Sequence, residues 1–135
     1  ENIQVREEYL TKNPHVYADL CQLQQIFRNL IRNAMEAMPE GGNLIFRVKT
    51  DHGSGHMEMS FEDNGHGIRP EVENRLFEPF FTTKAYGTGM GLYISRKLVQ
   101  DNGGSLNYET TPDNGTTFHL SLPGNESSRR EDTKV

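Results

Sequence analysis

Two glycine clusters constrain this chain more than any other feature. Residues 63–68 (DNGHGI) follow a strand-like pattern, and residues 87–92 (GTGMGL) open a helical one. Glycine lets a backbone approach a ligand closely, and free N–H groups at the start of a helix attract anions. Taken alone, each cluster is also compatible with a plain glycine-rich turn. Residues 87–92 lack the Lys of a Walker motif and no βαβ unit surrounds them, so they predict another kind of phosphate site.

The hydrophobic pattern predicts a strand over residues 2–10 and an amphipathic helix from Asp19 to about Met38. Further predicted elements are strands at 43–50 and 57–62, a short helix after Pro70, a helix from about Met90 to 102, and a hairpin formed by 104–110 and 116–122. This order is typical of an α+β two-layer sandwich, in which a mixed sheet carries helices on one face.

The length of 135 residues predicts a single domain. We assign residues 1–123 to it and expect the polar residues 124–135 to be a disordered tail. A formal net charge of −5 argues against a nucleic-acid partner. The single cysteine, Cys21, excludes an internal disulfide and agrees with a reducing compartment, so we expect a cytoplasmic location. Because the chain begins with Glu, we expect it to be a piece of a longer protein, and a membrane anchor elsewhere in that protein is compatible with this.

Two asparagines in the predicted helix and one aspartate after a strand carry specific chemistry. Asn29 and Asn33 are four residues apart and lie on one helix face, and an amide oxygen suits Mg²⁺; the alternative is a merely solvated pair. Asp63 can accept a hydrogen bond from an exocyclic amino group and would repel a ring carbonyl, which favours adenine over guanine.

Residues 77–84 (FEPFFTTK) form part of an aperiodic stretch whose three phenylalanines are unusual for a plain loop. A loop of this length inside a domain is usually functional, and Lys84 can act as a point charge for phosphate. The five histidines show no metal-ligand spacing, and no catalytic-triad signature is present.

In order and spacing, the strings NLIRNAMEAM, DNGHGI, LFEPFFTTK, GTGMGL and NGTTF resemble the ATP-binding catalytic domain of sensor histidine kinases. That family belongs to the GHKL superfamily, with gyrase, the Hsp90 chaperones and MutL, whose ATP site is called the Bergerat fold. The resemblance covers roughly residues 10–123, and residues 80–92 are similar to the nitrogen-regulation type of kinase in particular.

The resemblance implies that ATP and Mg²⁺ bind here. Asn33 would chelate Mg²⁺, Asn29 would face the triphosphate, and Asp63 would bind adenine. The other nucleotide-binding residues that it implies are Gly65, Gly67 and Ile68 near the base, Thr82, Thr83 and Lys84 in a mobile lid formed by residues 68–88, Gly87, Gly89, Met90, Gly91 and Leu92 on the phosphate side, and Thr116 beside Asp63.

Two departures from related proteins bear on the activity. Several kinases of the family have Lys where this chain has Glu36, so neutralisation of phosphate charge would depend on Lys84 and the metal. The related ATPases have a general-base Glu where this chain has Asn29. An amide cannot take a proton from water, which favours a kinase.

The phosphoacceptor segment of these kinases is missing, because no His here stands in that context. We therefore expect this domain to phosphorylate a histidine on a separate dimerisation and phosphoacceptor domain, with a response-regulator receiver domain as the next partner, and to be monomeric in isolation. The alternatives are a GHKL-type ATPase and a nucleotide-dependent partner-docking module.

Overall fold

The computed structural model describes residues 2–79 and 91–124. Its elements are β1 (Ile3–Tyr9), α1 (Leu20–Glu36), β2 (Gly42–Thr50), β3 (His56–Asp63), α2 (Pro70–Glu73), α3 (Gly91–Asp101), β4 (Ser105–Thr111) and β5 (Gly115–Pro123). Within the described residues, five strands form one sheet in the order β1-β2-β3-β5-β4. β1 is parallel to β2, and the other neighbours are antiparallel. The predicted mixed sheet is confirmed, and the elements lie close to their predicted bounds.

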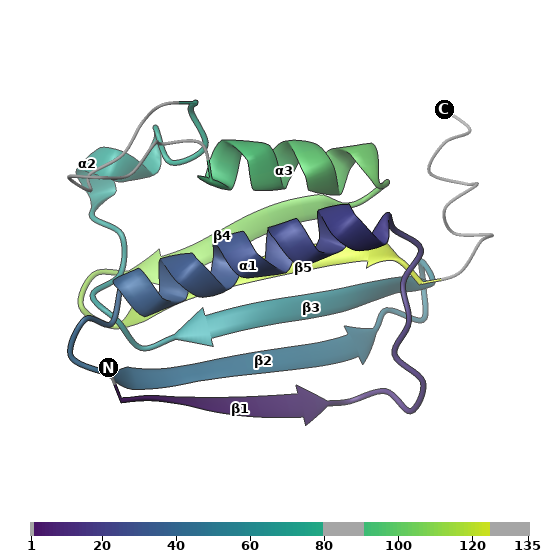
Figure 1. Ribbon diagram of the computed structural model, residues 1–135, viewed down its shortest axis with the longest axis horizontal. Coiled ribbons are helices and arrows are strands. Elements are labelled where there is room, and N and C mark those ends of the chain that lie inside the picture. Colours follow the sequence, from purple (N-terminus) through teal and green to yellow (C-terminus); the bar gives the residue numbers. More distant parts are fainter. Residues whose placement is uncertain (1, 80–90, 125–135) are drawn as a thin grey trace.

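Helices α1 and α3 lie over the same face of the sheet (Figure 1), where α1 contacts β3 and α3 contacts β4 and β5. The predicted α+β sandwich with helices on one face is therefore confirmed. Figure 1 also shows that the C-terminal end of β3, the C-terminal half of α1 and the start of α3 lie at the same end of the domain. Asp63, the asparagine pair of α1 and the glycine-rich start of α3 are therefore at the same end of the domain.

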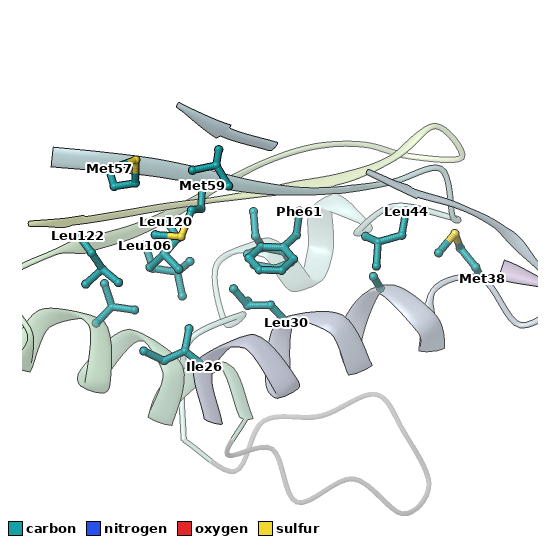
Figure 2. Packing of buried hydrophobic residues seen from close by; sticks show 14 residues of the cluster. Ile26, Leu30, Met38, Leu44, Met57, Met59, Phe61, Leu106, Leu120 and Leu122 are labelled. Carbon is teal, nitrogen blue, oxygen red and sulfur yellow. The ribbon is translucent and has the colours of Figure 1, made fainter. Parts of the chain in front are cut away.

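Helix α1 begins where the sequence predicts. The Asp19 carboxylate caps it by accepting a hydrogen bond from the backbone N–H of Gln22 at 2.9 Å. Ile26, Leu30 and Ala34 fall on its buried face. Figure 2 shows Leu30 pointing toward Phe61 of the sheet, inside a continuous apolar layer between helix and strands. Burying each such large side chain contributes about 1.5–3 kcal/mol, so this layer provides most of the stability.

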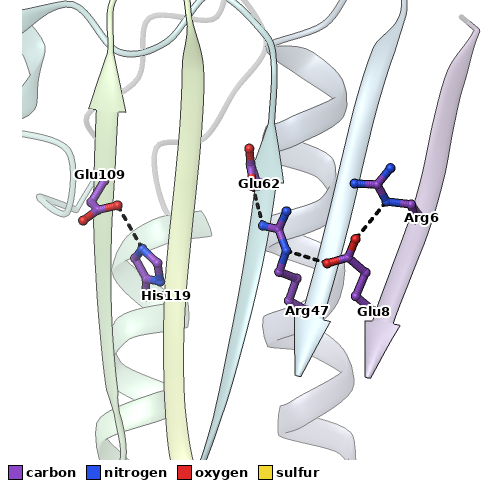
Figure 3. Close-up of polar contacts among 6 residues, drawn as sticks. All are labelled: Arg6, Glu8, Arg47, Glu62, Glu109 and His119. Atoms are coloured by element: carbon purple, nitrogen blue, oxygen red, sulfur yellow. Dashed lines mark hydrogen bonds and ion pairs between the residues drawn. The ribbon is translucent and has the colours of Figure 1, made fainter. Parts of the chain in front are cut away.

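The outer face of the sheet is polar. Nε of Arg47 on β2 lies 2.7 Å from Oε1 of Glu8 on β1, and the same guanidinium also pairs with Glu62 on β3 (Figure 3). Arg6 adds a contact of 3.0 Å to the other oxygen of Glu8. The hydrogen bond from Arg47 lowers the pKa of Glu8. These partly exposed pairs link the edge strand β1 to β2, and β2 to β3, although ion pairs in contact with water contribute little to stability.

Asn102, at the end of α3, joins the two helices. Its side chain is 4% exposed. Its Oδ1 accepts from the backbone N–H of Asp19 at 2.9 Å, and its Nδ2 donates to Oε1 of Gln22 and to the Leu98 carbonyl, both at 2.8 Å. The sequence indicated only that this segment ends a helix. The structure shows that it also fixes the start of α1.

We expect Asn102→Ala to lower the free energy of unfolding by about 1–3 kcal/mol, because buried partners lose their hydrogen bonds. Gln22→Ala removes one of the three bonds and should have a smaller effect. Urea denaturation of both variants checks this, and an unchanged midpoint for Asn102→Ala would contradict it.

Candidate functional site

Asp63 is the last residue of β3, and its side chain is 5% exposed. Its Oδ1 accepts backbone hydrogen bonds from Gly65 at 2.9 Å and from Thr116 at 3.2 Å. Within residues 2–79 and 91–124, no hydrogen bond is formed to Oδ2. Burial raises the pKa of Asp63, and the two backbone hydrogen bonds offset this in part. The carboxylate is thus held in one orientation with one oxygen still able to accept.

A threonine pair supports this carboxylate. The Oγ1 atoms of Thr116 and Thr110 lie 2.9 Å apart, and Thr110 Oγ1 accepts from the backbone N–H of Ile68 at 2.8 Å. The predicted residues Asp63, Ile68 and Thr116 are therefore joined in one network. Sequence reasoning missed Thr110, although the signal was present, since Thr110 and Thr116 are directly paired across the predicted closing hairpin.

Packing within the domain requires glycine at positions 65 and 67. A Cβ at Gly65 would lie 2.3 Å from the carbonyl oxygen of Ala37. Gly67 has a φ of +74°, and a Cβ there would lie 2.4 Å from the carbonyl oxygen of Thr111. The sequence predicted close approach to a ligand at these positions. The structure shows close approach to the chain's own backbone, which fixes the loop that carries Asp63.

We therefore expect Gly65→Ala to lower the free energy of unfolding by about 1–3 kcal/mol through overpacking. Gly91→Ala is the matched control, because a Cβ at Gly91 would meet no packed atom of the described residues within 4 Å. Alanine at this helical position should leave stability unchanged or raise it by up to about 1 kcal/mol. Urea denaturation of the two variants measures both effects, and equal midpoints would refute the packing explanation.

Asn29 and Asn33 of α1 are both half-buried, and Asn29 contacts α3. Nδ2 of Asn29 donates to the Gly91 carbonyl at 3.3 Å and to Oγ of Ser95 at 3.1 Å. The side-chain nitrogen of Asn29 therefore donates both of its hydrogen bonds to α3. Asn33 lies one turn further along α1, so the asparagine pair and the start of α3 are neighbours.

Several predicted site residues lie outside the described residues, namely Thr82, Thr83, Lys84, Gly87, Gly89 and Met90. Phe80 lies outside them too. Leu92, by contrast, is described and packs against the core.

Phe77, at the start of the long aperiodic stretch, is partly buried and packs against the core. The guanidinium carbon of Arg96 lies 3.9 Å from the centre of its ring, and the ring of Tyr108 is 6.0 Å away. The Tyr108 hydroxyl donates to Glu73 of α2 at 3.1 Å. Arg96, which the sequence did not single out, therefore helps to attach the α2 region to α3 and β4.

The described side chains are compatible with a magnesium ion whose ligands are mainly phosphate oxygens and waters. Among them, no group of three or more His, Cys, Asp or Glu could hold a metal. Mg²⁺ commonly keeps several waters and binds through one or two protein oxygens together with phosphates. The amide oxygens of α1 match that requirement, whereas a stand-alone metal centre is not formed by these residues.

The family described as "Histidine kinase-, DNA gyrase B-, and HSP90-like ATPase" matches residues 18–126. The chain belongs to this family. Sporulation kinase E of Bacillus subtilis (strain 168) is 38% identical over 133 residues, which covers 97% of this chain and 18% of that protein. The sensory histidine kinase/phosphatase NtrB of Azospirillum brasilense is 41% identical over 135 residues, covering 90% of this chain and 34% of that protein.

Solved structures agree with this family assignment. The nucleotide-free catalytic domain of histidine kinase ThkA superposes with a TM-score of 0.82 at 32% identity, covering 94% of this chain and 82% of that one. The complex of ThkA with response regulator protein TrrA matches with a TM-score of 0.74 at 29% identity, covering 91% of this chain and 34% of that one. The protein is thus a histidine kinase ATP-binding catalytic domain, and the predicted resemblance is confirmed.

The chain spans only about a fifth to a third of the curated relatives it matches. No helix in the described part is long and apolar enough to cross a membrane.

Proposed function

We propose that this domain binds ATP with Mg²⁺ and supplies the γ-phosphoryl group for autophosphorylation of a histidine on the dimerisation and phosphoacceptor domain of its kinase. The receiver domain of a response regulator would then take the phosphoryl group. The complex of the similar kinase ThkA with the response regulator protein TrrA supports a response regulator as a partner. Use of ATP and of such a partner supports a cytoplasmic location.

The observation that carries the proposal is the geometry of Asp63. Its Oδ1 is occupied by two backbone N–H groups, so Oδ2 is the atom that would accept the adenine amino group. Guanine would place a carbonyl oxygen against the same atom, which is repulsive. Ile68, held by Thr110, would line the base pocket.

On the phosphate side, Asn33 would hold Mg²⁺, and the first N–H groups of α3, beginning at Gly91, would face the phosphates. Bound Mg²⁺ supplies charge neutralisation for the transferred group. Lys84 remains the proposed point charge in place of the lysine that this chain replaces with Glu36. Positioning and charge stabilisation are therefore the main contributions of this chain.

Asn29 favours a kinase over a GHKL-type ATPase. It stands where the ATPases have their general base, and its amide can neither take a proton from water nor leave its bonds to Gly91 and Ser95 without cost. Hydrolysis therefore lacks a base at that position. A degenerate docking module is the remaining alternative, and the intact Asp63 network argues against it.

One comparison tests these alternatives. The domain alone, given ATP and Mg²⁺, should release ADP slowly, whereas the complete kinase should incorporate an acid-labile phosphoryl group on histidine from γ-labelled ATP. Fast ADP release by the domain alone would identify an ATPase. Nucleotide binding with neither product would identify a docking module.

A further inference from the structure

The orientation of the Asn29 amide is fixed by its partners. A carboxamide has a donating and an accepting end of similar shape, and the neighbours decide which end faces them. The Gly91 carbonyl can only accept a hydrogen bond, and it lies 3.3 Å from the side-chain nitrogen. The nitrogen must therefore face α3, which leaves the oxygen as the group available elsewhere.

Ser95 is the second partner of that nitrogen, and its side chain is 0% exposed. A buried hydroxyl is costly unless it is hydrogen-bonded, and Oγ of Ser95 meets this need with Asn29 at 3.1 Å. Because Ser95 is completely buried, it cannot touch a nucleotide. Any effect that it has on binding must pass through other residues.

We infer that Ser95 is a positioning residue of the nucleotide site. Together with the Gly91 carbonyl, it holds the Asn29 amide with its oxygen directed away from α3. It also holds the first turn of α3 beside the turn of α1 that carries Asn29, one turn before Asn33. This inference rests on the proposed function, because it assumes that ATP and Mg²⁺ bind at this end of the domain.

The fixed orientation changes the role of Asn29 that the family resemblance implies. An amide oxygen accepts hydrogen bonds from water and can face a cation, but it cannot donate to a phosphate oxygen. Asn29 therefore serves the hydrated metal side of the nucleotide, and a direct bond from its nitrogen to the triphosphate is not expected.

The chain offers a matched control at the other end of the same helix pair. Asn102 and Gln22 also join α3 to α1, at the N-terminal end of α1. Both connections use a buried polar side chain, Ser95 within α3 and Asn102 directly after it. The connection through Ser95 reaches Asn29, one helical turn before Asn33, whereas Gln22 lies near the other end of α1. A purely structural role would give the two connections similar effects on nucleotide binding.

The test is calorimetric titration of the domain with ATP, with Mg²⁺ and with EDTA, beside urea denaturation. Ser95→Ala should weaken binding of ATP with Mg²⁺ about ten-fold, the scale of one or two lost hydrogen bonds, and should change metal-free binding much less. Asn102→Ala should lose more stability while its ATP affinity stays within about two-fold of wild type. Ser95→Cys, which leaves no cavity but is a weaker hydrogen-bond acceptor, replaces the alanine variant if that one unfolds.

A double-mutant cycle completes the test. If Ser95 acts through Asn29, the Asn29→Ala/Ser95→Ala variant should bind ATP no more weakly than Asn29→Ala alone. Additive losses, an equal loss without metal, or unchanged affinity in Ser95→Ala would each overturn the inference while wild type still binds ATP. Failure of the wild-type domain to bind ATP would instead overturn the proposed function together with it.

Discussion

Asp63→Asn is expected to weaken ATP binding by about 1.5–3 kcal/mol, the scale of a hydrogen bond to a charged group, and to leave the fold intact. The position of Oδ1 decides the outcome. Two backbone N–H groups point at that atom, so the asparagine oxygen must take its place. The asparagine NH₂ then faces the adenine amino group, and a donor meets a donor. The same NH₂ would suit the guanine carbonyl, so the preference for ATP over GTP should fall or reverse.

Titration calorimetry with ATP and GTP measures both effects. Asp101→Asn is the matched control, because it makes the same chemical change at an exposed position at the far end of α3. Its affinities should equal those of wild type. Equal affinity of the wild-type domain for the two nucleotides, or an unaffected Asp63→Asn variant, would remove Asp63 from the site.

The pH dependence of Asp63 gives a second measurement on the same variant. Burial raises the pKa of this carboxyl group, so it is protonated at a higher pH than an ordinary aspartate. On acidification, ATP affinity should therefore begin to fall at a higher pH than it would for an aspartate with an ordinary pKa, and Asp63→Asn should remove that dependence.

A raised folded-state pKa also means that this group favours the folded state below its unfolded-state pKa, and that this contribution is lost as the pH rises through the folded-state pKa. At neutral pH the variant should thus be no less stable than wild type.

Local patterns were sufficient to predict most of the fold. Asp19 followed by an apolar row at helical spacing determines where α1 begins and which face it buries. Pro70 at the first helical position marks α2. In both cases the information lies within a few neighbouring residues, and packing in the folded domain agrees with it.

Contacts between distant segments could not be predicted in this way. Ser95 and Asn102 read as ordinary residues in and after a helix, since their partners, Asn29 and Gln22, are 66 and 80 positions away. Gly65 was identified correctly as a position that requires glycine, but for a different reason. The obstacle, the Ala37 carbonyl, is brought near only when α1 packs on the sheet.

Asn33→Ala is expected to reduce phosphoryl transfer in the complete kinase by about a hundred-fold or more, the scale of losing a few kcal/mol of charge stabilisation in the transition state. Nucleotide should still bind, because the Asp63 network lies on β3 and the β4–β5 hairpin and does not include Asn33. The fold should persist too, since alanine is the best helix former. Loss of transfer with retained binding is the result that a metal ligand predicts.

The Asn33→Asp variant distinguishes the effect of losing the metal ligand from the effect of charge beside the phosphates. Its carboxylate can still ligate Mg²⁺, but it adds a negative charge beside the triphosphate, so transfer should stay low while metal-dependent binding partly returns. Gln25→Ala, at an exposed position of the same helix, is the control and should retain full activity. Incorporation of phosphoryl groups from γ-labelled ATP, measured with and without EDTA, distinguishes these cases. Full autophosphorylation by the Asn33→Ala kinase would exclude Asn33 as a ligand, and the metal would then have to be held by the phosphates and by other oxygens of the domain.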